Sequence, residues 1–297
     1  MVQLLARYFF APLFLSVRGW QYLYNLQGGF ALSQPEAEAH YRYFFGGFGG
    51  FAPIYDESYM VRLDEYQGQA YVQLACTQLV GSNTPGFGNP IFSKMECSLK
   101  EQEKKQKQII DEWIAFFKTN PKALTGVLFR TGITQTLLEA VCNQEKLEIL
   151  RIKWGTNLDL SVLQNVLNLK SLYFEGFRSS LPNVSFLDCL QNLRVLNLYS
   201  INSIEDFSPL YRMKNLEELC ISGKAPTKGK RIIFTDLEFL RNHPDLKMLG
   251  CGNLEVERLY TVSELEALRQ KLPQLHTSCD FFTRTIAKAS KGKHIIL

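Results

Sequence analysis

The sequence predicts an α/β fold: a curved solenoid with a parallel β-sheet on its concave face, preceded by a small α+β domain. Three observations predict it. A leucine frame recurs at nearly constant spacing, apolar groups with helical spacing lie between its copies, and a charged helical segment separates the frame from an aromatic, glycine-rich beginning. A chain of 297 residues is long enough for about two domains. We expect an α+β domain over 1–95, a capping helix over 96–123 and the repeats over 124–297.

The leucine frame has the form L-x-x-L-x-L, in which a strand carries apolar residues at positions one, four and six. Its clearest copies begin at Leu147, Leu169, Leu193 and Leu216, with spacings of 22, 24 and 23 residues. Copies also begin at Leu124 and Leu246, and a degraded copy begins at Leu275, so the last two spacings are 30 and 29 residues. The frame therefore predicts about seven coils.

Apolar residues three or four positions apart predict a short helix on the far side of most coils. These groups are Leu137, Leu138 and Val141; Leu160, Leu163 and Leu167; Leu187 and Leu190; Leu237 and Leu240; and Leu265 and Leu268. One coil alone cannot bury both its strand leucines and its helix leucines. Stacked coils bury them in one continuous core, and their strands then form a parallel sheet.

With these repeats, residues 124–280 resemble the leucine-rich-repeat family, near its class with coils of about 22 residues. The phrase from Pro209 to Leu219 is similar to the repeats of internalin-type proteins. The resemblance implies binding of another macromolecule, without catalysis by the repeats. The family usually places asparagine shortly after the third apolar position, but that column here reads Gly155, Phe177 and Ile201. We therefore expect irregular coil turns.

The segment before the repeats is typical of an exposed helix that covers the end of a solenoid. Residues 98–112 contain neither glycine nor proline and are rich in lysine, glutamate and glutamine, which favour helices. Trp113, Phe116 and Phe117 supply an apolar face, and the helix is expected to stop near Asn120 and Pro121. The charge run is interpreted as a solvated face.

Residues 1–95 are dense in aromatic residues and glycine, and they suggest a small α+β domain. Alternating polarity over residues 59–65 and 70–76 predicts a β-hairpin, and residues 33–45 fit a helix. The apolar run over residues 8–17 is too short to span a bilayer, and we interpret it as a structural element. The glycine run over residues 46–51 lacks the Gly-Lys-Ser/Thr ending of a phosphate loop and is interpreted as a turn.

Charge and cysteine content narrow the compartment and the class of partner. Residues 1–95 hold 5 basic and 6 acidic residues, and residues 96–297 hold 28 and 23, a balance too mild to predict nucleic-acid binding. Seven cysteines form an odd set without a C-x-x-C pair. In a chain of this length they favour reduced thiols and a cytoplasmic location.

The binding candidates come from positions five and seven of the frame, which point away from the leucines because strand side chains alternate. Column five reads Leu128, Arg151, Tyr173, Asn197, Cys220, Gly250 and Cys279, and column seven reads Arg130, Lys153, Glu175, Tyr199, Ser222 and Gly252. The first four coils are therefore expected to present Arg130, Arg151, Lys153, Tyr173, Glu175, Asn197 and Tyr199 on one surface. Arginine and tyrosine are enriched where interfaces hold their binding energy, although polar residues there also serve solubility alone.

We therefore expect a cytoplasmic protein that binds a partner protein with an acidic or mixed surface, without a metal or cofactor. An alternative is an enzyme whose active site lies in residues 1–95, with the repeats as substrate receptor. It would place the Cys76 thiol within hydrogen-bond reach of His40, with Asp56 or Asp64 as orienting carboxylate. A third alternative is membrane association through residues 8–17 and the basic tail of Lys288, Lys291 and Lys293.

Overall fold

A computed structural model describes residues 60, 62–76, 98–129, 131–153, 158–175, 180–201, 203–223, 232–243, 245–252, 254–273, 275–277 and 281–296. The chain divides into two units, Met1–Tyr55 and Asp56–Leu297, and the structure described here belongs to the second. The expected helix over residues 33–45, the apolar run over residues 8–17 and the glycine turn over residues 46–51 lie outside the described residues.

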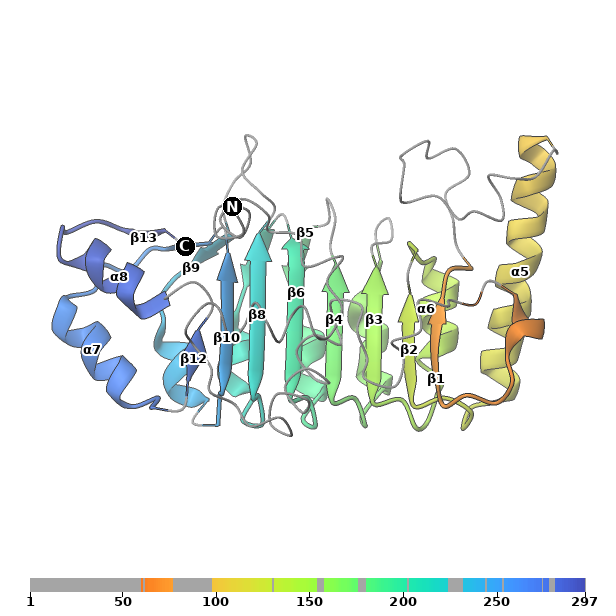
Figure 1. Ribbon diagram of the computed structural model, residues 1–297, viewed down its shortest axis with the longest axis horizontal. Helices are drawn as coiled ribbons and strands as arrows, with labels where there is room; N and C mark the ends of the chain where they lie inside the picture. The colour runs from red at the N-terminus through yellow and green to blue at the C-terminus, as the bar shows by residue number, and fades with distance from the viewer. Residues whose placement is uncertain are drawn as a thin grey trace, which may run out of the picture. The chain divides into compact units, whose positions relative to one another are not determined.

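The described part of the chain is built on an eight-stranded parallel sheet with the order β1-β2-β3-β4-β6-β8-β10-β12 (Figure 1). The strands are β1 (Tyr71–Leu74), β2 (Gly126–Phe129), β3 (Ile149–Lys153), β4 (Ser171–Glu175), β6 (Val195–Ile201), β8 (Glu218–Gly223), β10 (Met248–Gly252) and β12 (His276–Thr277). From β2 to β10, each strand begins two residues after the first leucine of its frame. The predicted solenoid with its parallel sheet is confirmed.

The far side of the solenoid carries one short helix per coil, mostly a 3-10 helix. These helices are α6 (Gln135–Val141), η4 (Leu160–Asn165), η5 (Ser185–Cys189), η6 (Ser208–Arg212), η7 (Glu238–Asn242) and α7 (Val262–Gln270). They confirm the predicted helical groups. Leu167 is an exception, because it follows η4 and is 59% exposed rather than buried. The coils need only one turn of helix to return the chain to the sheet, which favours the tight 3-10 form.

Two smaller sheets are formed mainly by strands that lie, along the sequence, between a concave strand and the far-side helix that follows it. Strands β5 (Ser180–Asn183) and β7 (Ser203–Asp206) pair in parallel. Strands β9 (Ile232–Phe234) and β11 (Leu254–Val256) also pair in parallel, and β13 (Ile295–Ile296) adds to β11 in the antiparallel direction. The final residues of the described chain are thereby attached to the stack.

One continuous apolar core runs through the coils. The fourth-position leucines Leu150, Leu172, Leu196, Leu219 and Leu249 are at most 2% exposed and belong to the same cluster as the helix leucines Leu163, Leu187, Leu210 and Leu240. Burial of such side chains stabilises a fold by about 1.5–3 kcal/mol each relative to exposure. Because neighbouring coils bury each other's leucines, the stacking is the main source of stability.

An asparagine ladder links successive coils at the position just before the first leucine of the frame. The side-chain amides of Asn168, Asn192 and Asn215 donate to the backbone carbonyls of Glu145, Leu167 and Gln191, at 2.8, 2.8 and 2.7 Å. The resemblance placed the asparagines after the third apolar position, but in this chain the ladder stands just before the first leucine. The asparagines satisfy turn carbonyls that no strand or helix bond reaches.

A line of ion pairs follows the same edge of the stack, at position two of the frame. Lys170 Nζ lies 2.8 Å from a Glu148 carboxylate oxygen, and Lys247 Nζ lies 3.0 Å from a Glu217 carboxylate oxygen. Arg194 pairs with the same Glu217 carboxylate. These side chains are partly exposed, so each pair contributes little to stability, but together they align opposite charges between neighbouring coils.

The first end of the stack is covered by α5 (Leu99–Thr119), which lies within the segment predicted to be helical (Figure 1). Ser98 forms a capping box with Glu101 at its start. Trp113 and Phe117 are fully buried in the core, while the charged first half of the helix is exposed. Gln144 fastens the helix to the stack, because its amide donates to the Phe117 carbonyl at 2.8 Å and accepts from the Leu124 N–H at 3.2 Å.

The predicted β-hairpin over residues 59–76 is wrong. Its first arm contains the 3-10 helix η3 (Leu63–Glu65), and Met60 bridges Leu74 in parallel rather than antiparallel. Its second arm is β1, which pairs in parallel with β2 and so extends the sheet beyond the first leucine frame. Alternating polarity specifies a half-buried strand but does not specify its partner.

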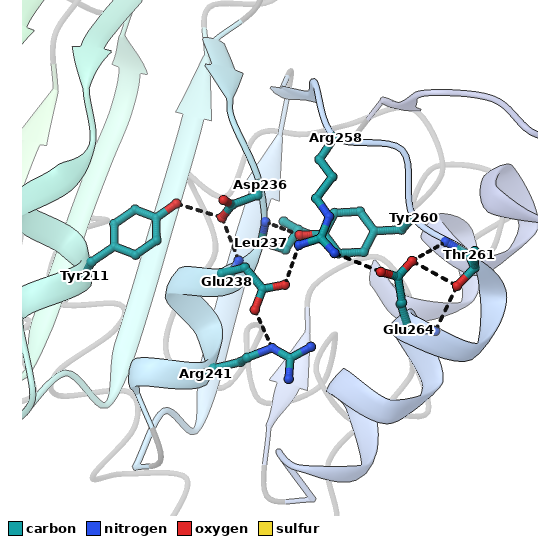
Figure 2. Close-up of polar contacts among 9 residues, drawn as sticks. All are labelled: Tyr211, Asp236, Leu237, Glu238, Arg241, Arg258, Tyr260, Thr261 and Glu264. Carbon is teal, nitrogen blue, oxygen red and sulfur yellow. Dashed lines mark hydrogen bonds and ion pairs between the residues drawn. The ribbon is translucent and has the colours of Figure 1, made fainter.

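The other end of the stack is covered by α7 and α8 (Phe281–Ala289) (Figure 1). A polar network joins this end to the preceding coils (Figure 2). The Tyr211 hydroxyl donates to Asp236 Oδ1 at 2.8 Å, and the Leu237 N–H donates to the Tyr260 hydroxyl oxygen at 2.7 Å. Burial, followed by the bond to Asp236, raises the pKa of Tyr211, so its hydroxyl remains a donor over the physiological range.

Arg258 is the centre of the same network (Figure 2). Its guanidinium lies 4.6 Å from the centre of the Tyr260 ring and pairs with Glu238 and Glu264, both at 2.8 Å. Glu264 also completes the capping box of α7 with Thr261. The network therefore positions the first turn of α7 against η7, and we assign it a structural role. No helix within the described residues is long and apolar enough to cross a bilayer.

The asparagine ladder predicts a measurable loss of stability. Replacing Asn192 by Ala removes the bond to the Leu167 carbonyl, and we expect the free energy of unfolding to fall by about 0.5–1.5 kcal/mol. Asn165→Ala, at an exposed asparagine on η4, is the matched control and should change it by less than about 0.5 kcal/mol. Urea denaturation followed by circular dichroism measures both, and equal effects would contradict the ladder.

The cap makes a second prediction. Trp113→Ala leaves a cavity under α5 and exposes the end of the core, so we expect a loss of about 3–5 kcal/mol. Lys104→Ala, on the exposed face of the same helix, should leave the unfolding midpoint nearly unchanged. If Trp113→Ala unfolded like the unmodified chain, α5 would not be the cap of this core.

Candidate functional site

Column five forms one line across the concave sheet. The strand pairing places Gln73, Leu128, Arg151, Tyr173, Asn197, Cys220 and Gly250 in successive register. Neighbouring strands lie about 4.8 Å apart, so Arg151 and Asn197, two strands apart, are separated by about 10 Å of sheet. The alignment expected from the frame is confirmed from Leu128 to Gly250, and the sequence did not predict Gln73 as part of this line. Cys279 lies outside the described residues.

Column seven forms a second line beside it. Lys153, Glu175, Tyr199, Ser222 and Gly252 pair in successive register. Glu175 and Ser222 are partly exposed, so the accessible margin of the described concave face lies in this column. Arg130, which the frame also places here, lies outside the described residues.

The expectation that column five presents its side chains to solvent is wrong. Arg151 and Tyr173 are each 3% exposed, and Asn197 is 1% exposed. None of these three belongs to the leucine core cluster, because they lie on the opposite face of the sheet. Strand alternation specifies the direction of a side chain, but whether other parts of the chain cover it depends on tertiary structure.

Arg151 joins the two columns through its guanidinium. The group lies 4.7 Å from the centre of the Tyr173 ring, a distance at which the ring face attracts a cation. One terminal nitrogen, Nη2, lies 3.8 Å from a carboxylate oxygen of Glu175. Their side chains are only 4% and 16% exposed, so the pair is screened less than the ion pairs at the edge of the stack.

Several polar atoms of this line have no hydrogen-bond partner among the residues described. They are Nε and Nη1 of Arg151 and both amide atoms of Asn197. A buried polar group left unpaired costs about 1–3 kcal/mol, and a charged group costs more. Native proteins satisfy most such groups, so each exception requires a physical reason. Here the unpaired atoms offer donors from Arg151 and both a donor and an acceptor from Asn197.

A third line of concave residues, which was not predicted from the sequence, lies beside column five. Position three of the frame also faces away from the leucines, and the register places Ile149, Ser171, Val195, Glu218 and Met248 there. Ser171 and Glu218 are buried polar residues in this line. The two-residue period of a strand would have identified them, because position three precedes position five by two. Gln73 was missed because β1 was assigned to a hairpin.

In the enzyme alternative, Cys76 would be the nucleophile, but the structure places its thiol in the buried core. Cys76 is fully buried, and burial raises the pKa of its thiol to about 12. A nucleophilic cysteine requires a thiolate near neutral pH, which burial in apolar surroundings opposes. His40 and Asp56 lie outside the described residues, and the carboxylate of Asp64 pairs with Arg62.

The repeat segment has the leucine-rich-repeat fold, as its coil spacing, parallel register and asparagine ladder establish. Internalin C2 of Listeria monocytogenes is similar, with 21% identity and a TM-score of 0.38 over 52% of this chain and 61% of that chain. A leucine-rich-repeat protein of Leptospira interrogans is 13% identical, with a TM-score of 0.37 over 52% of this chain and 36% of that one. The PEPR1–AtPEP1 structure is 20% identical, with a TM-score of 0.36 over 54% and 21%.

The chain therefore spans less than two thirds of the length of each of these proteins. No protein-family model matches the sequence, and no curated protein matches it.

The burial of most described cysteines, among them Cys220 of column five, predicts a pattern of thiol reactivity. Burial raises the pKa of the Cys76, Cys142 and Cys220 thiols to about 12, whereas Cys189 is exposed. In a chain with Cys97→Ser and Cys279→Ser, we expect iodoacetamide at pH 8 to modify Cys189 first and the three buried thiols only after unfolding.

Peptide mass spectrometry of a time course measures the order of modification. Because a thiol with a raised pKa favours the folded state only while it stays protonated, this stability should be lost as the pH rises from about 9 towards 12. Rapid alkylation of Cys220 in the folded chain would contradict burial of column five.

Proposed function

We propose that the solenoid is a protein-binding module that recognises its partner through columns five and seven of the concave sheet. The observation that carries the proposal is a set of polar atoms on Arg151 and Asn197 that have no hydrogen-bond partner among the described residues, in register on either side of Tyr173. Polar groups that lower the stability of the fold are retained when they contribute to another task, and recognition is the task that solenoid surfaces perform.

The chemistry of the line defines the partner. The free edge of the Arg151 guanidinium suits a carboxylate or a carbonyl oxygen, and the Asn197 amide can both donate to and accept from a peptide bond. The Tyr173 ring supplies apolar contact between them. These groups favour an extended segment of a protein with an acidic or mixed surface, bound across the strands.

The partner is expected to contact column seven first, because this column holds the accessible side chains of the described concave face. Glu175 and Ser222 are partly exposed, whereas the groups of column five are buried in the unbound chain. Binding must therefore uncover column five, so we expect association slower than simple docking of two preformed surfaces. The cytoplasm is the compartment that we propose, in keeping with the free thiols of the described cysteines.

Site-specific photo-crosslinking tests the proposal. A benzoylphenylalanine placed at Glu175 or at Ser222 should give a crosslinked adduct with a discrete partner in the native cell extract. The same residue at Gln164, exposed on the far-side helix η4, is the matched control and should give none. Two concave positions are used because replacing Glu175 also removes the carboxylate that faces Arg151.

Mass spectrometry of the adduct identifies the partner and the crosslinked segment. A partner segment with acidic or mixed composition, captured at both concave positions, supports the proposal. Adducts that form only at Gln164, or equally at all three positions, would contradict recognition by the concave sheet. A small-molecule-processing enzyme would give no adduct at any of them.

A further inference from the structure

The C-terminal end of the described chain contains a concentrated basic surface around a cavity. Arg284, Lys288, Lys291 and Lys293 line a cavity of about 220 Å³, together with Ala287. A water molecule takes up about 30 Å³ of liquid volume, so this space accommodates a group larger than a single water. The cavity lies beyond the concave sheet and is separate from columns five and seven.

The helix α8 carries two of these cations, Arg284 and Lys288, and Lys291 lies in the turn that follows it. Residues 284, 287 and 288 follow the i, i+3, i+4 spacing that places side chains on one side of a helix. The opposite side is anchored in the core, because Phe281, Phe282 and Thr285 are buried. The cations are therefore held on a packed element rather than on a loose tail.

The end of α8 returns the chain so that Lys293 joins the cluster. Gly292 has a positive φ of 60°, and its N–H donates to the Ala289 carbonyl at 2.9 Å. The Lys293 N–H donates to the Lys288 carbonyl at 3.1 Å, which completes a Schellman motif. Two residues later, Ile295 is 1% exposed and pairs with Val256, so both walls of the cavity are fixed to the core.

The charges in this cavity differ from those along the stack. Lys170, Arg194, Arg212, Lys247 and Arg258 all pair with carboxylates. Within the described residues, none of the four cations of the cavity forms an ion pair with a carboxylate. Four like charges around a small space repel one another, and an anion placed between them relieves that repulsion.

The macrodipole of α8 alone would account for some of these lysines, because cations are favourable near a helix C-terminus. It does not account for Arg284, which lies in the first turn, where a cation is unfavourable. The Schellman bonds also occupy two terminal carbonyls that would otherwise repel an anion. The arrangement therefore favours a polyanion at the cavity over compensation of the helix dipole.

We propose that this cavity is a binding site for a phosphate-bearing group, either a free phosphorylated small molecule or the headgroup of a phosphorylated lipid. Phosphate oxygens accept several charge-assisted hydrogen bonds at once, which suits four converging cations. The neighbouring solenoid supplies the rigid support.

Calorimetric titration of the full chain tests the site, with pyrophosphate and soluble inositol trisphosphate as probes. We expect saturable binding of at least one of them. Lys288→Gln with Lys291→Gln should weaken it by roughly tenfold or more. Lys104→Gln with Lys107→Gln, on the exposed face of α5, removes the same charge at the same spacing and should leave the affinity unchanged. Circular dichroism verifies that both variants fold.

Vesicle sedimentation then distinguishes the two sources of the phosphate. Phosphatidylcholine vesicles containing a phosphoinositide should retain the chain if the ligand is a lipid headgroup. Saturable binding of the soluble probes without vesicle retention assigns a free phosphorylated molecule. The proposal is overturned if neither soluble probe binds, or if both double variants weaken binding equally.

Discussion

The structure depends on one constraint: a single coil cannot bury its own leucines. Leu150 and Leu163 of one coil are covered only because the coils on both sides supply Leu172, Leu187 and their equivalents. Stacking aligns the strands in parallel, and the alignment brings side chains from distant parts of the sequence into straight lines across the concave face. The ends of such a stack must be closed, which α5 does with Trp113 at one end. The polar network around Arg258 joins the cap at the other end to the coils.

Much of this architecture could be predicted from the sequence because the frame encodes it directly. The concave strands from β2 to β10 and the capping helix follow from leucine spacing and from a helical, glycine-free segment. Strand β1 could not be predicted this way. Its frame begins at Gln69 rather than at leucine, 55 residues before Leu124, and α5 intervenes. The asparagine ladder was also missed, since its position before the first leucine follows from the geometry of the turn.

The candidate site was predictable in its alignment but not in its environment. The frame identified Arg151, Tyr173 and Asn197 as neighbours, and the register confirms this. Their burial depends on contacts that periodicity does not contain. That burial changes the physical meaning of the site. An exposed arginine would serve solubility as well as binding, whereas a buried guanidinium whose donors find no partner among the described residues lowers stability and therefore needs a compensating role.

The most direct test replaces the unpaired polar groups by apolar ones of similar size, Arg151→Met and Asn197→Leu, and measures unfolding free energy and partner crosslinking on the same variants. The account predicts that Asn197→Leu is as stable as the unmodified chain, or more stable, because unpaired buried polar atoms have been removed. Arg151→Met also removes the contact with the Tyr173 ring and the pairing with Glu175, so a loss of stability is expected for that variant. Crosslinking through Ser222 should nevertheless be lost. A loss of several kcal/mol in stability with unchanged crosslinking would contradict the account, because it would show that Arg151 and Asn197 maintain the fold rather than recognise a partner.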